Sequence, residues 1–416
     1  MRWFSRSSGL NEPVSKSRTV IVIEDWAHRS EGHFPRRFAE LTEAFTALGW
    51  HGEVLTSRGW VHETDADPVP FAVSRYGRLA LVLDRVASRL QRVSRQTRLG
   101  NLARTFGGQL RVMAIVGSAR SIRRRTNGSA DVVVLSYGID VVLAAALAGR
   151  GRWLFYAFEP PSVVLEGRQI RLESRLAKWA ERRRRAQGGG ACIVTPYERS
   201  RAEWSAIAPF MTPTVLAIAG CSVSFPIPNA RDQLGIFPAD RIALIFGSKY
   251  NKDCDVVWRA FSELEDWRLL IGGHVTDLYI AAGQPLAARR PILIDGFVSN
   301  ATRELAYSAA DLVILSFRPD YERNSGTLMD AISWGIPVVC SERSGAAELV
   351  QRFRLGVTFT PGDAQSLANA VRLAPERIHD DDVHRARKDL SNAAVATRFL
   401  ELFQQLSRSQ SAPICA

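Results

Sequence analysis

Short apolar runs alternate with helical segments along the whole 416-residue chain, and this alternation restricts the fold more than any other feature. Each run is rich in β-branched or aromatic residues and is bounded by polar or glycine-rich turns. The runs are 19–25, 51–57, 131–137, 153–159 and 191–196 in the first half, and 241–248, 267–273, 291–297, 310–317 and 336–342 in the second. Buried parallel strands separated by helices have this pattern, so we predict an α/β protein with two doubly wound, Rossmann-like domains.

The two predicted domains join near residues 205–230, which are rich in proline and small residues. We expect a first domain over 1–208 with a basic helical insert at 75–125, a second domain over 209–395, and a C-terminal helix and tail over 396–416. A helical pattern over about 383–408 is expected to cross back onto the first domain. Ligands of doubly wound sheets bind at the carboxyl ends of the strands, so the functional residues are expected there.

Cysteine content and hydropathy indicate the compartment. The five cysteines are scattered and lack CxxC spacing, which argues against a disulfide framework or a zinc site. No apolar run approaches the ~20 residues that a membrane-spanning helix needs. The first 18 residues also lack the apolar core of a secretory signal. We therefore predict a reduced, cytoplasmic chain.

The stretch YERNSGTLMDAISWGIPVVC follows a predicted strand and holds two acids around a small-residue turn. Ser325, Gly326 and Thr327 stand where a helix begins, and the free N–H groups and dipole of a helix start favour phosphate. Glu322 precedes the turn, and its carboxylate could accept hydrogen bonds from sugar hydroxyls. Asp330 lies inside the helix, and its carboxylate could accept hydrogen bonds from a ribose. The alternative is an ordinary helix cap flanked by two surface acids.

Two other strand ends in the second half carry candidate binding residues. In FGSKYNKDCD, Gly247 permits close backbone approach, and Lys249 and Lys252 suit a diphosphate, although loop lysines are often merely solvated. In DGFVSNATRELAYSAAD, the backbone of the turn at Phe297 and Val298 is expected to hydrogen-bond a nucleotide base, with Arg303 nearby.

The first half offers three candidates. Gly32 lies at the start of a predicted helix, where a phosphate or sugar fits, and His33 beside it is either an acceptor contact or a solvated loop histidine. Glu159 ends a strand before two prolines that fix the turn. It is the candidate acid for catalysis or for orienting an acceptor.

In order and spacing, the second half resembles the donor half of GT-B glycosyltransferases of family 4 (group 1). The resemblance runs over about 170 residues through IALIFGSKYNK, LLIGGH, ILIDGFVSNATRELAYSAADLVILSF, NSGTLMDAISWGIPVVCSERSGAAELV and GVTFTPGDAQSLANAV. The first half resembles the family more loosely, through EGHFPRRFAELTEAFTALGWHGEVLTS. The resemblance implies two Rossmann-like domains facing across a cleft, with the acceptor side in residues 1–208 and the donor side in 209–395.

The resemblance also implies roles for individual residues. Glu322 would contact the donor sugar, the Ser325–Thr327 turn the phosphates, and Asp330 the ribose. Lys252 would neutralise the leaving diphosphate, and Gly32 would approach it from the other domain. The implied reaction is retaining transfer from a nucleotide-diphosphate sugar to a hydroxyl acceptor, lipid-linked or part of a cell-envelope glycan. It needs no protein nucleophile, no metal and no cofactor.

The sequence departs from the family pattern in three places. Asp330 stands where the family has Glu, Ser248 and Lys249 stand where it usually has an arginine, and Ser136 or Tyr137 stands where it often has a histidine. Two other functions therefore stay open: a nucleotide-sugar epimerase on the same fold, and a non-catalytic partner subunit that binds nucleotide or membrane. A dehydrogenase is disfavoured, because no G-x-G-x-x-G follows a predicted strand.

Positive charge is concentrated in residues 75–125, which hold 13 arginines and one acidic residue, Asp84. The predicted helix there has an apolar stripe beside one that contains Arg85, Arg89 and Arg92. Basic amphipathic helices bind anionic membrane surfaces, so we expect peripheral binding at the inner face of the cell membrane. A solvated face is the alternative. Nucleic acid is disfavoured, because no nucleic-acid-binding signature accompanies the charge.

Overall fold

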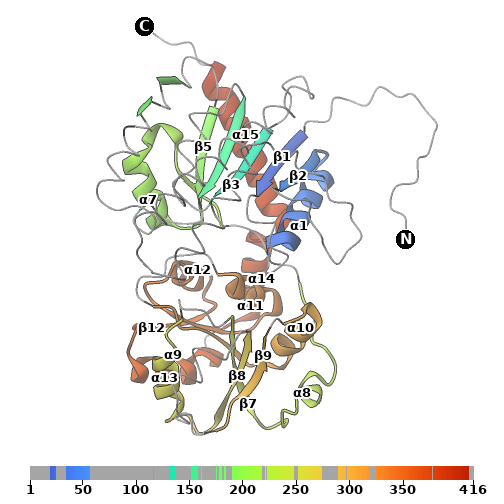
Figure 1. Cartoon of the computed structure of the whole chain (residues 1–416), viewed down its shortest axis with the longest axis vertical. Coiled ribbons are helices and arrows are strands. Elements are labelled where there is room, and N and C mark those ends of the chain that lie inside the picture. The colour runs from blue at the N-terminus through green and yellow to red at the C-terminus, as the bar shows by residue number, and fades with distance from the viewer. Residues whose placement is uncertain are drawn as a thin grey trace, which may run out of the picture.

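The structure of the protein is a computed structural model, shown whole in Figure 1. It describes residues 19–24, 34–56, 131–136, 151–157, 190–217, 223–247, 252–273, 289–296, 298–318, 325–376 and 378–411, and the single residues 116, 161, 175, 178, 179, 182, 183 and 221. Apart from Val116, the predicted basic insert at 75–125 lies outside the described residues. The described residues form two α/β domains stacked along the long axis of the molecule (Figure 1).

The first sheet has six parallel strands among the described residues, in the order β2-β1-β3-β4-β5-β6. Their bounds are β1 (Thr19–Glu24), β2 (His51–Thr56), β3 (Asp131–Ser136), β4 (Arg152–Ala157), β5 (Gly190–Thr195) and β6 (Thr214–Val215). Helix α1 (Phe34–Ala47) and helix α15 (Asn392–Ser411) pack against the same face of this sheet. Helix α7 (Glu198–Ile207) and a short 3-10 turn, η2 (Pro209–Met211), follow β5.

The second sheet is also parallel and runs in the order β12-β11-β10-β7-β8-β9. Its strands in the described residues are β7 (Arg241–Phe246), β8 (Trp267–Gly273), β9 (Ile292–Asp295), β10 (Leu312–Leu315), β11 (Val338–Ser341) and β12 (Gly356–Phe359). The order reverses between β7 and β10, the two central strands. Such a reversal opens a crevice at the carboxyl ends of the strands.

Helices cover both faces of the second sheet, which explains the continuous apolar runs in its sequence. In β7, Ile242 and Leu244 face one core, and Ala243 and Ile245 face the other. The first core is covered by α10 (Asn300–Ala309), α11 (Gly326–Trp334), α12 (Gly345–Phe353) and α14 (Asp380–Asp389), with α8 (Ala230–Gln233) at its edge. The second core is covered by α9 (Cys254–Phe261), α13 (Ala364–Leu373) and η3 (Ala374–Glu376).

The predicted fold class of two doubly wound domains is confirmed, and each predicted run overlaps a strand. Two short edge strands, β6 and β12, were not predicted. Because β6 belongs to the first sheet, the predicted boundary at 208–209 falls inside the first domain. The helical stretch predicted over 383–408 is two helices, which break between Asp389 and Asn392, and the second of them crosses back onto the first domain as predicted.

The chain crosses twice between the domains, and the two crossings lie side by side. At the first crossing, Leu216 packs into the core of the first domain and Ala217 into that of the second. At the second, Cys221 and Ser391 form an isolated parallel bridge. Asn392 then donates a hydrogen bond to Glu40 of α1 (3.0 Å), which fixes the start of α15 on the first domain.

Candidate functional site

Loops that leave β7 and β10 meet where the strand order of the second sheet reverses. Gly247, directly after β7, has a φ of 75°, a left-handed conformation that favours glycine. Its N–H donates to the carbonyl of Gly272 (2.8 Å), and a side-chain atom built at Gly247 would meet none of the described residues within 4 Å. The backbone here is held firmly and has open space beside it, as the predicted close approach of a ligand requires.

Lys252 lies in the loop after β7 and is only 3% exposed. Its ammonium group is 4.6 Å from the ring centroid of Phe317, two residues after β10, and has no hydrogen-bond partner among the described residues. Burial lowers the pKa of Lys252 to about 8, against a smaller opposing effect of Cys254. The interpretation of Lys252 as a solvated loop lysine is therefore wrong.

Helix α11 begins beside this loop. Ser325 caps it by accepting a hydrogen bond from the N–H of Leu328 (3.2 Å). The hydroxyl of Thr327 donates to the carbonyl of Phe246, the last residue of β7 (3.5 Å). The first N–H groups of α11, including that of Gly326, thus lie at the carboxyl end of the central strands. A helix start in this place is a ready anion-binding site.

Asp330 lies in the second turn of α11, close to α10. The guanidinium of Arg303 on α10 approaches its carboxylate, with 3.8 Å between Nη1 and Oδ2, and the two side chains are 12% and 15% exposed. Tyr307 lies one turn further along α10 and is 1% exposed. Its ring stacks on Phe246 (5.8 Å between centroids) and on Trp334 of α11 (6.5 Å).

The electrostatics of this cluster fix the protonation of Tyr307. Burial raises the pKa of its hydroxyl well above the usual value, and the charge of Asp330 raises it further. The hydroxyl therefore keeps its proton and can donate a hydrogen bond. The side chains of Thr327 and Asp330 lie within reach of the hydroxyl, although none of the described residues gives it a hydrogen bond of normal geometry.

The structure brings together about half of the residues predicted for the site. The crevice and the adjoining cluster contain Gly247, Lys252, Arg303, Ser325, Gly326, Thr327 and Asp330. The side chain of Val298 is half-buried and packs against the first core of the second domain. The remaining predicted residues lie outside the described residues: Gly32, His33, Glu159, Lys249, Phe297 and Glu322.

Two residues of this region were missed by the sequence analysis. Tyr307 follows Arg303 by four residues, a spacing that puts both on one helix face, and this was a usable signal. Phe317 gave no local signal, because its contact with Lys252 joins two loops. Arg303 was expected beside a base-binding turn, and the structure pairs it with Asp330.

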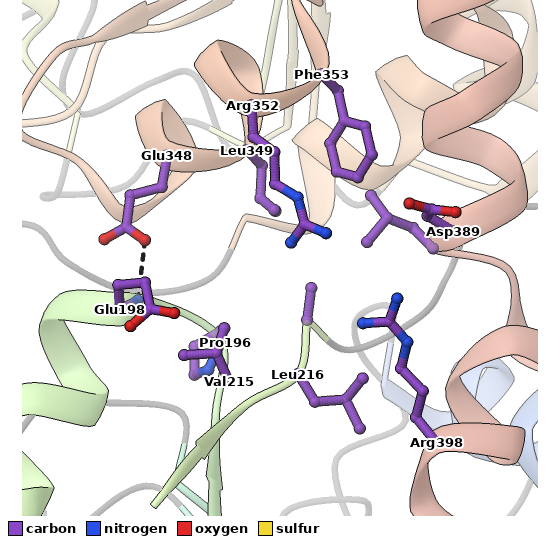
Figure 2. Close-up of a pocket in the computed structure, with 12 residues that line it drawn as sticks. Pro196, Glu198, Val215, Leu216, Glu348, Leu349, Arg352, Phe353, Asp389 and Arg398 are labelled. Atoms are coloured by element: carbon purple, nitrogen blue, oxygen red, sulfur yellow. Dashed lines mark hydrogen bonds between the residues drawn. The ribbon is translucent and has the colours of Figure 1, made fainter.

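A small cavity of about 80 Å³ lies between the two domains, next to the crossings. Leu216 and Leu349 are among the residues that line it, and Figure 2 shows Arg352 and Arg398 extending into it from opposite sides. Beside it, Glu348 of α12 accepts a hydrogen bond from the first N–H of α7 (2.9 Å). The carboxylate of one domain thereby caps a helix of the other, which ties the domains together at this edge.

Tyr197 strengthens the same junction. Its ring lies so close to Gly345 of α12 that a side-chain atom built there would be 2.2 Å from it. Gly345 is therefore required for the two domains to approach. Among the described residues, no group of His, Cys, Asp and Glu side chains is arranged to hold a metal ion. None of the described helices has the length and hydropathy to cross a membrane.

The part of the chain that contains the crevice is similar in sequence to a known type of domain. Residues 240–374 match the family model described as "Glycosyl transferases group 1". The chain therefore carries a group 1 glycosyltransferase domain, which contains the crevice. An uncharacterized glycosyltransferase of Methanocaldococcus jannaschii, MJ1607, is 25% identical over 170 residues, 39% of this chain and 43% of that protein. The match thus spans less than half of that relative.

Solved structures match nearly the whole chain. Sucrose-phosphate synthase of Thermosynechococcus elongatus has a TM-score of 0.66 at 14% identity, over 94% of this chain and 100% of that one. A glycosyltransferase of Rickettsia africae has a TM-score of 0.63 at 13% identity, over 94% and 99%. Anabaena HepE in complex with UDP-glucose has a TM-score of 0.52 at 14% identity, over 95% and 99%. The fold is that of GT-B glycosyltransferases.

Proposed function

We propose that the protein is a retaining glycosyltransferase that moves a sugar from a nucleotide-diphosphate donor to a hydroxyl acceptor. One observation carries the proposal: a buried Lys252 and the start of α11 both lie at the carboxyl ends of the two central strands, inside the segment that matches a group 1 glycosyltransferase domain. A buried ammonium and a helix N-terminus both favour an anionic ligand. The complex of HepE with UDP-glucose supports a nucleotide sugar as the donor class.

In this proposal the diphosphate lies against the start of α11 and the open backbone at Gly247. Lys252 turns from the Phe317 ring toward the diphosphate and neutralises it. Asp330 accepts hydrogen bonds from the ribose. By the resemblance of the sequence, Glu322 contacts the donor sugar and Gly32 approaches the diphosphate from the first domain.

The proposed chemistry needs positioning and charge stabilisation. The bond between the anomeric carbon and the diphosphate oxygen breaks, and a bond to the acceptor oxygen forms on the same face of the sugar. Lys252 and the helix dipole stabilise the departing diphosphate, which takes the proton of the acceptor hydroxyl. Glu159 is proposed to orient that hydroxyl, and no metal or cofactor takes part in this scheme.

The test begins with the donor. The melting temperature of the purified protein is measured with a panel of nucleotide sugars, and the one that raises it most is used in a transfer assay. Glu322→Ala is expected to abolish transfer and to keep the wild-type melting temperature. Near-wild-type turnover by this variant would show that the donor-site assignment is wrong. If the protein isomerises the nucleotide sugar in the absence of any acceptor, it is an epimerase. If it binds the nucleotide sugar but neither transfers nor isomerises the sugar, it is a non-catalytic partner subunit.

We further propose that the acceptor is lipid-linked or belongs to a cell-envelope glycan, and that this cytoplasmic protein meets it at an anionic membrane surface through residues 75–125. The arginine excess of that segment supports this step. Binding to anionic vesicles should fade as salt rises, because charge is screened beyond ~8 Å at physiological ionic strength. Co-sedimentation tests it. Replacing Arg85, Arg89 and Arg92 by Gln should lower vesicle binding and spare nucleotide binding, whereas equal, salt-insensitive binding to neutral vesicles contradicts it.

A further inference from the structure

The geometry points to Arg303 and Tyr307 as positioning residues that hold the Asp330 carboxylate in place for the ribose hydroxyls of the donor. The inference rests on the proposed function and adds two residues to it. Both side chains come from one face of α10 and converge on a single acid of α11. Neither needs to touch the nucleotide, since both act through Asp330.

Arg303 holds Asp330 by charge. The separation of 3.8 Å between Nη1 and Oδ2 is too long for a hydrogen bond, so this contact occupies no acceptor site of the carboxylate. The pair of Arg231 and Asp311 differs: one guanidinium nitrogen donates to both carboxylate oxygens at 2.7 Å, as in a purely structural pair. At 12% and 15% exposure, the attraction between Arg303 and Asp330 is screened much less than on the surface.

Tyr307 is a second, independent observation at the same acid. Its hydroxyl is buried without a hydrogen bond of normal geometry to the described residues, which is rare in native structures and is often linked to function. Phe246 and Trp334 clamp its ring by stacking on it. The hydroxyl is therefore fixed beside Asp330 as a donor, ready to hydrogen-bond the carboxylate when that carboxylate adjusts to a ribose.

The clamp also connects Asp330 with the crevice. Phe246, which stacks on Tyr307, is the last residue of β7 and accepts the hydrogen bond from Thr327 at the start of α11. The position of Asp330 is thus set by the same contacts that place the predicted phosphate site. An aspartate reaches less far than a glutamate by one methylene, so its carboxylate depends more on such neighbours for its position.

The test compares ribose with deoxyribose. Binding of UDP, GDP and ADP and of their 2′-deoxy forms is measured by calorimetry for the wild type, Arg303→Gln, Arg303→Lys and Tyr307→Phe. The wild type should prefer the ribose form roughly tenfold, the strength of one charge-assisted hydrogen bond. In Arg303→Gln the ratio of the affinities for the ribose and deoxyribose forms should fall to near one. In Arg303→Lys this ratio should be partly restored. Tyr307→Phe should reduce it by a smaller factor.

Two controls make the outcome decisive. Arg259→Ala removes an exposed arginine of α9 that pairs with Asp255, and it should leave the preference unchanged. In an Asp330→Ala background, Arg303→Gln should have no further effect, because a residue that acts through another loses its effect with it. Equal loss of affinity for ribose and deoxyribose forms would overturn the inference and leave the proposed function standing. A wild type that binds none of these nucleotides would overturn both.

Discussion

Replacing Lys252 with methionine should make the ligand-free protein more stable while it weakens donor binding. The side chain is 3% exposed, and its ammonium has no hydrogen-bond partner among the described residues. Burial lowers its pKa from 10.5 to about 8, which corresponds to ~3 kcal/mol of unfolding free energy lost while the lysine is charged. Methionine keeps the apolar stem and can place its sulfur against the Phe317 ring.

The pH dependence follows from the direction of the shift. Below about pH 8 the lysine is protonated in both the folded and the unfolded chain, so the folded protein bears the full cost. Between about 8 and 10.5 only the unfolded chain keeps the proton, and stability rises with pH. Above 10.5 both forms are neutral and the cost has disappeared. The advantage of Lys252→Met should therefore be full at about pH 7 and small at about pH 10.

Urea denaturation of both proteins at about pH 7 and about pH 10 measures this difference, and the comparison cancels other groups that titrate. Lys388→Met on the exposed surface of α14 is the matched control and should change stability little at either pH. Calorimetry with the donor should show weaker binding for Lys252→Met than for the wild type, and unchanged binding for Lys388→Met. If Lys252→Met is no more stable than the wild type at about pH 7, or if its advantage does not shrink with pH, the reasoning is refuted.

Three further changes test the architecture of the site. Ser325→Ala removes the cap of α11 and should lower the unfolding free energy by about 1 kcal/mol and weaken nucleotide binding, measured by denaturation and calorimetry. Gly356→Ala should abolish soluble folded protein, judged by yield and circular dichroism, since its Cβ would lie 1.9 Å from the carbonyl oxygen of Val338. Glu348→Gln should lower the unfolding free energy by about 1 kcal/mol, because a neutral amide caps α7 less well; an unchanged melting curve would contradict this.

The alternation of apolar runs and helices predicted both sheets except for their short edge strands, β6 and β12. The run around Leu244 is apolar on both faces, and that property directly reflects the helices on each side of the second sheet. The placing of Ser325 at a helix start also followed from the local sequence, because small polar residues prefer that position. The break between α14 and α15 had a local signal that was missed: Ser391 caps α15 by accepting a hydrogen bond from the N–H of Ala394 (3.1 Å).

Contacts between distant segments lay beyond the sequence pattern. The burial of Lys252 depends on Phe317, which belongs to another loop, and no periodicity connects them. The pairing of Arg303 with Asp330 depends on how α10 and α11 pack, since each residue alone resembles an ordinary polar position on a helix. The carboxyl-end rule predicted where the site lies, but its electrostatics required the three-dimensional arrangement.

The return of α15 to the first domain has a consequence for the order in which the protein folds during synthesis. Val395 and Phe399 of this helix belong to the core formed by β1, β3 and α1, and the hydrogen bond from Asn392 to Glu40 spans 352 residues of sequence. The ribosome therefore completes the second domain before it supplies the last part of the first. Until then the part of this apolar face that α15 covers stays exposed, although α1 already packs on the rest. A nascent chain in this state needs protection from aggregation, and translation that stops before α15 should damage the first domain more than the second.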